Sequence, residues 1–257
     1  MKIIFVGTGS GKTSRKRFHS SIIVKSNDHS MLVDTGDGVA KALLALNIKT
    51  NSIDSILLSH YHADHFGGIA SLITQMKLEK RTKQLKVFTH MDLVKPLNAF
   101  LNTSYLFEEN LGFKLVLSQF KFGTKQKVSG SISFVPQRNS HIFRKKILKN
   151  YPAKQFVSSS FLLNVGSSSI FYTSDVGSAN DLFLFKNYKT KYLITETTHM
   201  TAGQVLSAAK TLNVSKLFLT HIGDEDEKKI TAWHKNLSEA DQKKVKICYD
   251  GLKIQLT

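Results

Sequence analysis

Short apolar runs alternate with longer amphipathic segments along the whole chain. The short runs are rich in β-branched and aromatic residues, which is typical of strands, whereas apolar residues three and four positions apart indicate helices. The runs predict strands at 2–6, 21–25, 31–34, 55–58, 86–89, 115–117, 131–135, 160–165, 169–173, 191–195, 216–220, 247–249 and 252–255. The amphipathic segments predict helices at 38–46, 67–76, 92–101, 179–185, 201–212 and 225–236.

The order of these elements predicts the architecture. The first three strands should form an antiparallel set, and the last two should form a hairpin about Asp250-Gly251. Each half of the chain begins with strands and continues with strand–helix units, which indicates two β-sheets packed face to face with helices outside. No Gly/Ser/Pro-rich linker interrupts the chain, so we expect a single domain over residues 1–257.

The densest cluster of chemically active residues follows one of the predicted strands. Ser59-His60-Tyr61-His62-Ala63-Asp64-His65 comes directly after Ile56-Leu57-Leu58. Alternation places the first two histidines on the same side, and the turn that follows allows Asp64 and His65 to reach a second point nearby. Neutral imidazoles and carboxylates are ligands for zinc, manganese or iron. A polar loop that holds histidines by chance is the alternative, but the spacing favours a metal site.

One such segment cannot saturate two metals, so the other ligands should lie at other strand ends. His141, Asp175 and His221 each follow a predicted strand within a few residues. Each of them alone could be a capping or turn residue. Three at equivalent strand ends favour a rigid site at the edge of a sheet.

A glycine-rich segment near the N-terminus suggests a second kind of site. Gly7-Thr8-Gly9-Ser10-Gly11-Lys12-Thr13 follows a strand, like a phosphate-binding P-loop, but Val6 stands where that pattern needs its first glycine. The run Ser14-Arg15-Lys16-Arg17 is basic and reads as solvated, where a P-loop would continue into an apolar helix. We therefore expect the glycines to serve a tight turn.

The histidine motif and the three strand-end residues resemble the metallo-β-lactamase superfamily, and the similarity runs through nearly the whole chain. Phe5–Gly9, Val33–Gly38, Thr173–Asp175 and His199–Gln204 are similar to segments of ribonuclease Z. Glu196–His199 and Tyr249–Ile254 also resemble the cyclic-phosphate phosphodiesterase of the carbon–phosphorus lyase pathway. Both families cleave phosphodiesters. The resemblance implies an α/β fold, a four-layer αββα sandwich with two mixed sheets face to face.

The resemblance also implies a ligand set for two divalent cations, Zn²⁺ or Mn²⁺. One metal would be held by His60, His62 and His141, and the other by Asp64, His65 and His221, with Asp175 between them. Asp34 would orient histidine ligands. A role for Asp34 in capping the Thr35-Gly36 turn is equally compatible with the sequence.

Two cations about 3.5–4 Å apart can share a water and lower its pKa toward ~7, which would supply the nucleophile as metal-bound hydroxide. The leaving alkoxide still needs a proton. His199 is the candidate acid, with Glu196 orienting or charging it, and Asp64 belongs to this catalytic set as well as to the metal. A helix-capping or solvent-facing role is the alternative for His199.

The charge balance, 36 basic against 19 acidic residues, gives a net charge of +17. Basic residues cluster at 12–17, 77–86 and 138–154, and such a field attracts phosphate-bearing partners. A proteome that favours lysine would give the same balance. Charge alone therefore does not show nucleic-acid binding, and the partner is a phosphodiester substrate that could be a nucleotide or a nucleic acid.

Two departures from the relatives bear on the substrate. Ribonuclease Z carries a long arm for the tRNA elbow, whereas residues 141–175 here leave room only for a basic stretch over 143–154 and two strands. The cyclic-phosphate enzyme carries a cysteine cluster, whereas this chain has one cysteine, Cys248. We predict a metal-dependent phosphodiesterase for a small or cyclic phosphodiester, with a nucleotide among the candidates.

Several alternatives stay open. The first is a ribonuclease Z-like tRNA 3′-processing endonuclease or another RNA or DNA nuclease, and a lactonase-type hydrolase is also compatible with the metal set. A non-catalytic metal sensor or nucleic-acid-binding scaffold is the alternative of another class. We see no signal peptide and no apolar stretch near ~20 residues, so we expect cytoplasmic residence without membrane contact. The sequence leaves a homodimer open.

Overall fold

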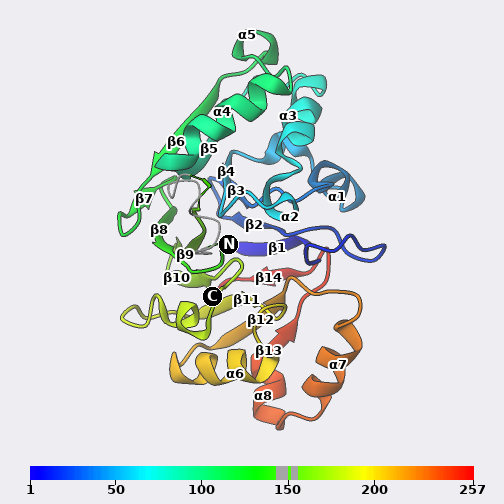
Figure 1. Cartoon of the computed structure of the whole chain (residues 1–257), viewed down its shortest axis with the longest axis vertical. Helices are drawn as coiled ribbons and strands as arrows, with labels where there is room; N and C mark the ends of the chain where they lie inside the picture. The colour runs from blue at the N-terminus through cyan, green and yellow to red at the C-terminus, as the bar shows by residue number, and fades with distance from the viewer. Residues whose placement is uncertain (143–149, 152–155) are drawn as a thin grey trace.

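The computed structural model describes residues 1–142, 150–151 and 156–257 of the chain. Within them, two seven-stranded β-sheets pack face to face, and helices cover the outer face of each sheet (Figure 1). The predicted αββα sandwich is therefore confirmed.

The first sheet has the strand order β14-β1-β2-β3-β4-β5-β6. Its opening strands β1 to β3 are antiparallel, as predicted, and β3 to β6 run parallel to one another. The strands are β1 (Lys2–Gly7), β2 (Ser21–Lys25), β3 (Ser30–Val33), β4 (Ser55–Leu57), β5 (Leu85–His90), β6 (Leu115–Phe120) and β14 (Lys253–Gln255).

The second sheet repeats this plan in the order β13-β12-β11-β10-β9-β8-β7. Strands β7 to β10 are antiparallel, and β10 to β13 are parallel. The carboxyl ends of parallel strands meet at one edge of a sheet, which is where ligands bind in α/β folds. The strands are β7 (Gln126–Lys127), β8 (Ile132–Arg138), β9 (Ser159–Val165), β10 (Ser168–Tyr172), β11 (Tyr192–Glu196), β12 (Lys216–Thr220) and β13 (Val245–Ile247).

The predicted C-terminal hairpin is wrong. Strand β13 pairs with β12 in the second sheet, whereas β14 pairs with β1 in the first. The turn is present, but the Asp250 carboxylate accepts hydrogen bonds from the backbone N–H groups of Thr8 (2.9 Å) and Phe18 (2.6 Å). These contacts attach the turn to the N-terminal loop, so the chain crosses from one sheet to the other.

The helices lie where the amphipathic segments predict them, with two differences. The predicted helix over 67–76 begins at Ile69 instead, where the Gly68 N–H donates to the Thr35 carbonyl (2.8 Å), and a separate short helix, Ala63–Phe66, precedes it. The segment at 179–185 forms a 3-10 turn. The α-helices are α1 (Val39–Ala45), α2 (Ala63–Phe66), α3 (Ile69–Leu78), α4 (Val94–Thr103), α5 (Glu108–Leu111), α6 (Ala202–Thr211), α7 (Glu227–Lys235) and α8 (Glu239–Lys244), and the 3-10 turns are η1 (Thr50–Ser52), η2 (Met91–Leu93) and η4 (Ala179–Phe183). In the described part of the chain, every helix is too short or too polar to cross a bilayer.

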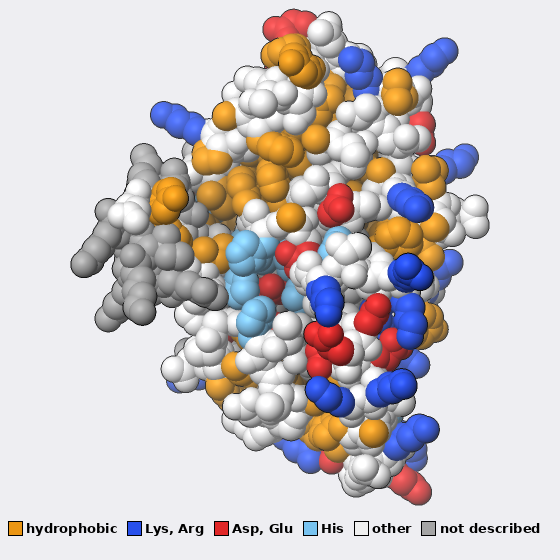
Figure 2. All heavy atoms as spheres, turned by 45° about the vertical axis from the view of Figure 1, so that its right-hand side comes forward, with side chains coloured by type: hydrophobic (Ala, Val, Ile, Leu, Met, Phe, Trp, Pro, Cys, Tyr) orange, Lys and Arg blue, Asp and Glu red, His pale blue; other side chains and the backbone are white. Residues whose placement is uncertain are grey.

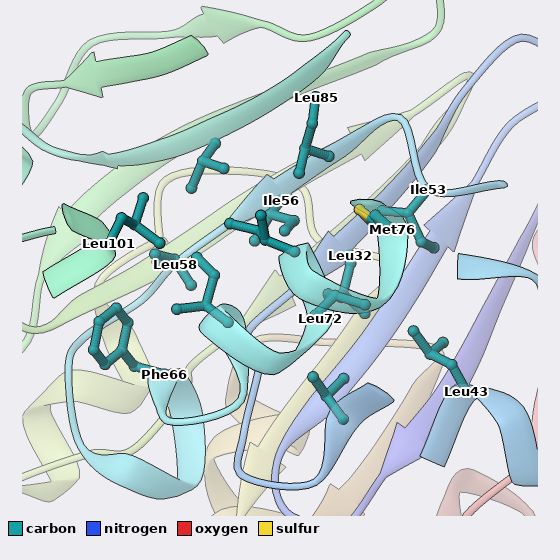
Figure 3. Packing of buried hydrophobic residues seen from close by; sticks show 14 of the residues in the cluster. Leu32, Leu43, Ile53, Ile56, Leu58, Phe66, Leu72, Met76, Leu85 and Leu101 are labelled. Carbon is teal, nitrogen blue, oxygen red and sulfur yellow. The ribbon is translucent and has the colours of Figure 1, made fainter. Parts of the chain in front are cut away.

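Apolar side chains fill three layers. One cluster lies between the sheets and includes Phe5, Phe134 and Phe161, and two further clusters lie under the helices on the outer faces. Figure 3 shows the cluster beneath α3, where Leu72 and Met76 pack over the first sheet. The central strands are buried on both faces, so the loops at their carboxyl ends start from a rigid base.

The N-terminal glycines permit a close approach of two backbone segments. A Cβ at Gly7 would lie 1.8 Å from the His19 carbonyl oxygen. Gly9 forms bridges to His19 and to Ile222. This geometry agrees with the turn interpretation rather than with a P-loop.

The prediction of a solvated basic run after these glycines is wrong for Arg17. Its guanidinium is buried, where it donates to Thr8 Oγ1 (2.7 Å) and to the Cys248 carbonyl (2.8 Å) and pairs with Glu227 (3.2 Å). Arg17 therefore joins the N-terminal loop to the second sheet.

Candidate functional site

The structure brings the seven predicted ligand residues together at the carboxyl ends of strands from both sheets. They come from the loops after four strands, β4, β8, β10 and β12. Figure 2 shows the histidines gathered at the centre of one face of the molecule, with acidic side chains beside them. These residues are His60, His62, Asp64, His65, His141, Asp175 and His221.

The first group of donor atoms belongs to His60, His62, His141 and Asp175. His62 Nδ1 lies 3.2 Å from His60 Nε2 and 3.1 Å from His141 Nε2. Asp175 Oδ2 lies 3.4 Å from His141 Nε2. The donor atoms of the group lie within 4.8 Å of one another, so they face one common point.

The second group consists of Asp64, His65, Asp175 and His221. Its histidine nitrogens face the other oxygen of Asp175, with His65 Nε2 at 3.1 Å and His221 Nε2 at 3.3 Å from Oδ1. Asp64 Oδ2 lies 3.0 Å from His221 Nε2. Asp175 is thus common to both groups and turns one carboxylate oxygen toward each.

Two buried polar atoms at this point, His65 Nε2 and Asp175 Oδ1, face each other at 3.1 Å without hydrogen-bond geometry, and neither has another hydrogen-bond partner among the described residues. A buried polar atom without a partner costs about 1–3 kcal/mol. Imidazole and carboxylate donors suit zinc or manganese. The arrangement therefore fits a pair of divalent cations, and the assignment of the seven residues as ligands stays a prediction.

Asp34 holds one of the histidines from behind. Its Oδ2 accepts hydrogen bonds from His65 Nδ1 (2.9 Å), from the Tyr172 hydroxyl (2.8 Å) and from Ser59 Oγ (2.9 Å), while its Oδ1 accepts from the Ser59 N–H (2.8 Å). Such a bond fixes the tautomer that leaves His65 Nε2 free for a metal. The Asp34 side chain thus makes the contact that the orienting role requires, and that role toward a metal ligand stays a prediction.

Sequence reasoning missed the hydroxyl groups that orient two other histidines. His60 Nδ1 contacts Ser59 Oγ (3.0 Å), and His221 Nδ1 contacts Thr198 Oγ1 (3.0 Å). In both cases the opposite nitrogen, Nε2, points to the cluster. Adjacency could have found Ser59, which directly precedes the histidine motif, whereas Thr198 reaches His221 across 23 positions and no local pattern indicates that contact.

The histidines have contrasting proton affinities. Burial lowers the pKa of His60 well below its ordinary value and lowers that of His141 to about 4, so both are neutral, which is the form that binds a metal. Burial also acts to lower the pKa of His65, but the Asp175 and Asp34 carboxylates outweigh it and hold that pKa well above its ordinary value. A cation held by His65 Nε2 and Asp175 would replace the proton on Nε2.

Glu196 and His199, the predicted catalytic pair, are in direct contact beside the cluster. His199 Nδ1 donates to Glu196 Oε1 (2.6 Å), and the ring of His199 lies 4.8 Å from that of His141, centroid to centroid. Glu196 is buried at the end of β11 and also accepts from the backbone N–H groups of Val176, Thr198 and His199. The hydrogen bond to Glu196 raises the pKa of His199.

A cleft of about 340 Å³ opens over the cluster. One wall is the N-terminal loop at Ser10–Lys12, and the opposite wall is Thr198 and His199. Lys12 pairs with Glu225 (2.9 Å), and Ser14 donates to Asp224 (2.6 Å). Part of the basic segment at 12–17 is thus paired with acidic residues at the rim. Most of the basic cluster at 138–154, including 143–149 and 152–155, lies outside the described residues.

Comparison with known proteins identifies relatives over most of the chain. A family model described as Anti-Pycsar protein Apyc1 matches residues 1–243. The Anti-Pycsar protein Apyc1 of Bacillus phage vB_BsuM-Goe3 is 25% identical over 246 residues, which cover 88% of this chain and 90% of that protein.

Ribonuclease Z proteins match over a shorter region. That of Aeropyrum pernix is 34% identical over 116 residues, which cover 45% of this chain and 36% of the relative, and that of Thermoplasma acidophilum is 35% identical over 105 residues, 41% of this chain and 34% of the relative. The match thus spans about a third of the length of these relatives.

Solved structures share the fold over the whole chain. The short form of human tRNase Z superposes with a TM-score of 0.75 at 18% identity and full coverage of both chains. A diphosphatase of the PhnP family gives 0.70 at 17% identity, with 100% of this chain and 98% of that chain covered. Zinc-bound PqqB from Methylobacterium extorquens gives 0.69 at 11% identity, again with full coverage of both.

At these identities the solved structures show a common fold, which is that of the predicted αββα sandwich. The predicted resemblance to the ribonuclease Z branch of the metallo-β-lactamase superfamily is thus confirmed, and the chain belongs to the Anti-Pycsar protein Apyc1 family.

Proposed function

We propose that the chain is a two-metal phosphodiesterase that hydrolyses a cyclic nucleotide. The observation that carries this proposal is the position of Asp175, which is shared by two groups of donor atoms while the Glu196–His199 pair lies at their side. One metal would be held by His60, His62 and His141, and the other by Asp64, His65 and His221, with Asp175 between them.

Two divalent cations, Zn²⁺ or Mn²⁺, would supply an acidified water and stabilise charge on the phosphate when bound. The protein side chains would position the nucleophile and the metal ligands. Asp175, with one oxygen toward each group, would hold the nucleophile in line with phosphorus, and Asp64 would fix the second metal at the rim of the cleft. Asp34 would keep His65 from rotating.

His199 would protonate the leaving oxygen. Its Nδ1 is committed to Glu196, so its exchangeable proton for the substrate is on Nε2. Because Glu196 is held by three backbone N–H groups, the pair is positioned without the substrate. An alkoxide is a poor leaving group, and general acid catalysis contributes about 10²–10⁴-fold to such a step.

Three observations support a cyclic nucleotide rather than a longer substrate. Membership of the Anti-Pycsar protein Apyc1 family points to cyclic nucleotides, and this match covers nearly the whole chain. The cleft of about 340 Å³ is within the ~300–1,000 Å³ range of small-molecule sites. The cleft is lined at its edge by Lys12, Glu225 and Asp226, and Lys12 is paired with Glu225, so these residues offer no excess positive charge for a polyanion.

The test is hydrolysis by the manganese- or zinc-loaded protein of a panel of 3′,5′-cyclic nucleotides, with bis-p-nitrophenyl phosphate as a general diester. The proposal expects conversion of at least one cyclic nucleotide to its monophosphate. Turnover of the general diester without any cyclic nucleotide would remove the substrate assignment but keep the phosphodiesterase. Inactivity toward every diester with two metals bound would favour a sensor or scaffold.

A second candidate is an RNA-processing nuclease. The matches to ribonuclease Z and the net charge of +17 favour it. Cleavage of a precursor tRNA, with an affinity that falls steeply as salt rises, would support this candidate, because several phosphate contacts release several counterions. A cyclic mononucleotide has one phosphate and should give a shallow dependence.

A further inference from the structure

A second cavity, of about 430 Å³, adjoins the cleft on the far side of His199. His199, Thr198 and Asp226 line both spaces, so they form the partition between them. The walls of the second cavity come from the start of α6 and from α7, neither of which carries a predicted metal ligand. The apolar side chains on these walls belong to Met200, Ile230 and Trp233.

Trp233 presents an aromatic surface to this cavity. It is the single tryptophan of the chain, and it is half-buried against the outer core of the second sheet. Besides His199, which would be protonated as the acid, the charged groups among the described lining residues are Asp226 and Lys229, which lie 3.8 Å apart as an ion pair. The cavity therefore suits a flat, uncharged ring better than a second phosphate.

The position of His199 relates this cavity to the reaction. The nitrogen that would protonate the leaving oxygen belongs to a ring that lines both spaces, so a group attached to that oxygen can extend from the cluster into the second cavity. Resting on the function proposed above, we propose that this cavity binds the nucleoside part of a cyclic nucleotide, with its base against Trp233. Base–aromatic stacking is tolerant of sequence, so this pocket would accept different bases.

The emission of Trp233 gives a direct test of binding that does not depend on turnover. The metal-loaded protein would be titrated with a non-hydrolysable cyclic nucleotide phosphorothioate and with an abasic ribose cyclic phosphate, in which a methoxy group replaces the base. The proposal expects a saturable change in emission with the first compound and none with the second. Equal responses to both, or no response to either, would overturn it.

Two variants test the same pocket through kinetics. Trp233→Ala should raise KM for a cyclic nucleotide about 5- to 100-fold and leave KM for the abasic compound unchanged. Trp233 also packs on the core, so a second variant is needed in case this one does not fold. A Cβ at Gly203 meets no described atom within 4 Å, so Gly203→Leu adds an apolar side chain at the cavity wall with open space around its first carbon.

Gly203→Leu should raise KM for the nucleotide and abolish the change in Trp233 emission. Ala240→Leu is the matched control, because Ala240 is exposed and occupies the second position of α8, as Gly203 does in α6. If the wild type hydrolyses cyclic nucleotides but both pocket variants keep the wild-type KM, the pocket assignment is wrong and the proposed phosphodiesterase function still stands. If no cyclic nucleotide is hydrolysed, the emission titration still decides the pocket.

Discussion

At the scale of single residues, the site depends on buried carboxylates that accept more hydrogen bonds than a surface carboxylate does. Asp34 and Glu196 each accept four within the protein. Networks of this kind hold their partners in one orientation, and losing one member leaves the others unpaired at about 1–3 kcal/mol each. His65 and His199 owe their orientation to these two residues.

His199→Ala should lower kcat for a cyclic nucleotide about 10²–10⁴-fold, because the leaving alkoxide would depart without a proton. The variant should keep both metals, since His199 contributes no donor atom to either group. Bis-p-nitrophenyl phosphate has a better leaving group, so the kcat of the variant for this substrate should fall less. A variant that hydrolyses the nucleotide at the wild-type rate would refute the role of His199 as the acid.

Glu196→Gln should shift the basic limb of the pH–rate profile to lower pH. The Glu196 carboxylate raises the pKa of His199, so the protonated acid persists to higher pH in the wild type than it would alone. Without that charge His199 loses its proton at lower pH, and kcat falls earlier as pH rises. The measurement is kcat against pH at saturating metal, and an unmoved basic limb would contradict the coupling.

Asp64→Ala should reduce the metal content from two ions to about one, because Asp64 contributes to the second group only. Metal analysis by mass spectrometry after dialysis would measure it. Asp37→Ala is the matched control, since Asp37 is an exposed aspartate in the neighbouring loop. Two ions bound to the Asp64 variant would refute its role as a ligand.

The predicted ligand residues could be picked out from residue type and from their position after strands. Apart from that of Ser59, the hydroxyl groups that hydrogen-bond to them and to Asp34 could not. The histidine motif and the strand-end residues His141, Asp175 and His221 stand out by type and by position. The Tyr172 hydroxyl reaches Asp34 across 138 positions, and no local pattern indicates such a contact. The burial of Arg17 was missed for the same reason, because its partners lie on the C-terminal part of the chain.

At the scale of elements, the loops after the strands are held by close backbone approaches. Gly36 is the clearest case, because a Cβ there would lie 2.3 Å from the Asp64 carbonyl oxygen and 2.6 Å from the Cβ of His19. Gly68 contributes through its N–H, which donates to the Thr35 carbonyl. The histidine motif therefore rests directly on the loop that follows β3.

Gly36→Ala should push the loop that carries Asp64 and His65 outward. Overpacking of this kind costs about 1–3 kcal/mol, which corresponds to a loss of roughly 2–10 °C in the unfolding temperature. Metal affinity should fall with it. Gly203→Ala, where the added carbon meets open space, should keep the unfolding temperature or raise it slightly. Equal unfolding temperatures for the Gly36 variant and the wild type would contradict the packing argument.

The order of strands and helices was predictable from the spacing of apolar residues along the chain, but the pairing of the last two strands was not. Residues 247–249 and 252–255 flank a turn at Asp250-Gly251, as the two strands of a hairpin do. The sequence shows this local pattern but not the partners with which each strand pairs. The pairing is decided by partners far away, β12 and β1, and by the bonds from Asp250 to Thr8 and Phe18. The short elements β7, α5 and α8 were missed because they carry too few residues to show a period.

At the scale of the whole molecule, the candidate metal site joins the two halves of the sandwich. One half contributes the motif after β4, and the other contributes His141, Asp175 and His221 from the loops after β8, β10 and β12. A cation bound by both halves would stabilise the folded chain alone, because the unfolded chain does not bring these residues together.

Removal of metal should therefore lower the unfolding temperature. At a metal concentration of 100 times Kd the bound ion stabilises by about 2.7 kcal/mol, so a chelator should lower the unfolding temperature by about 5–10 °C. Differential scanning calorimetry with and without chelator would measure it, and re-addition of zinc or manganese should restore the original value. An unchanged transition would indicate that the two halves are not joined by a metal.

The most direct measurement is product analysis after incubation of the metal-loaded protein with 3′,5′-cyclic nucleotides, with bound metal quantified in the same sample. Two bound ions and conversion to a single nucleoside monophosphate, lost on chelation and restored by metal, are the predicted result. A protein that binds two ions and leaves every cyclic nucleotide intact would contradict the account.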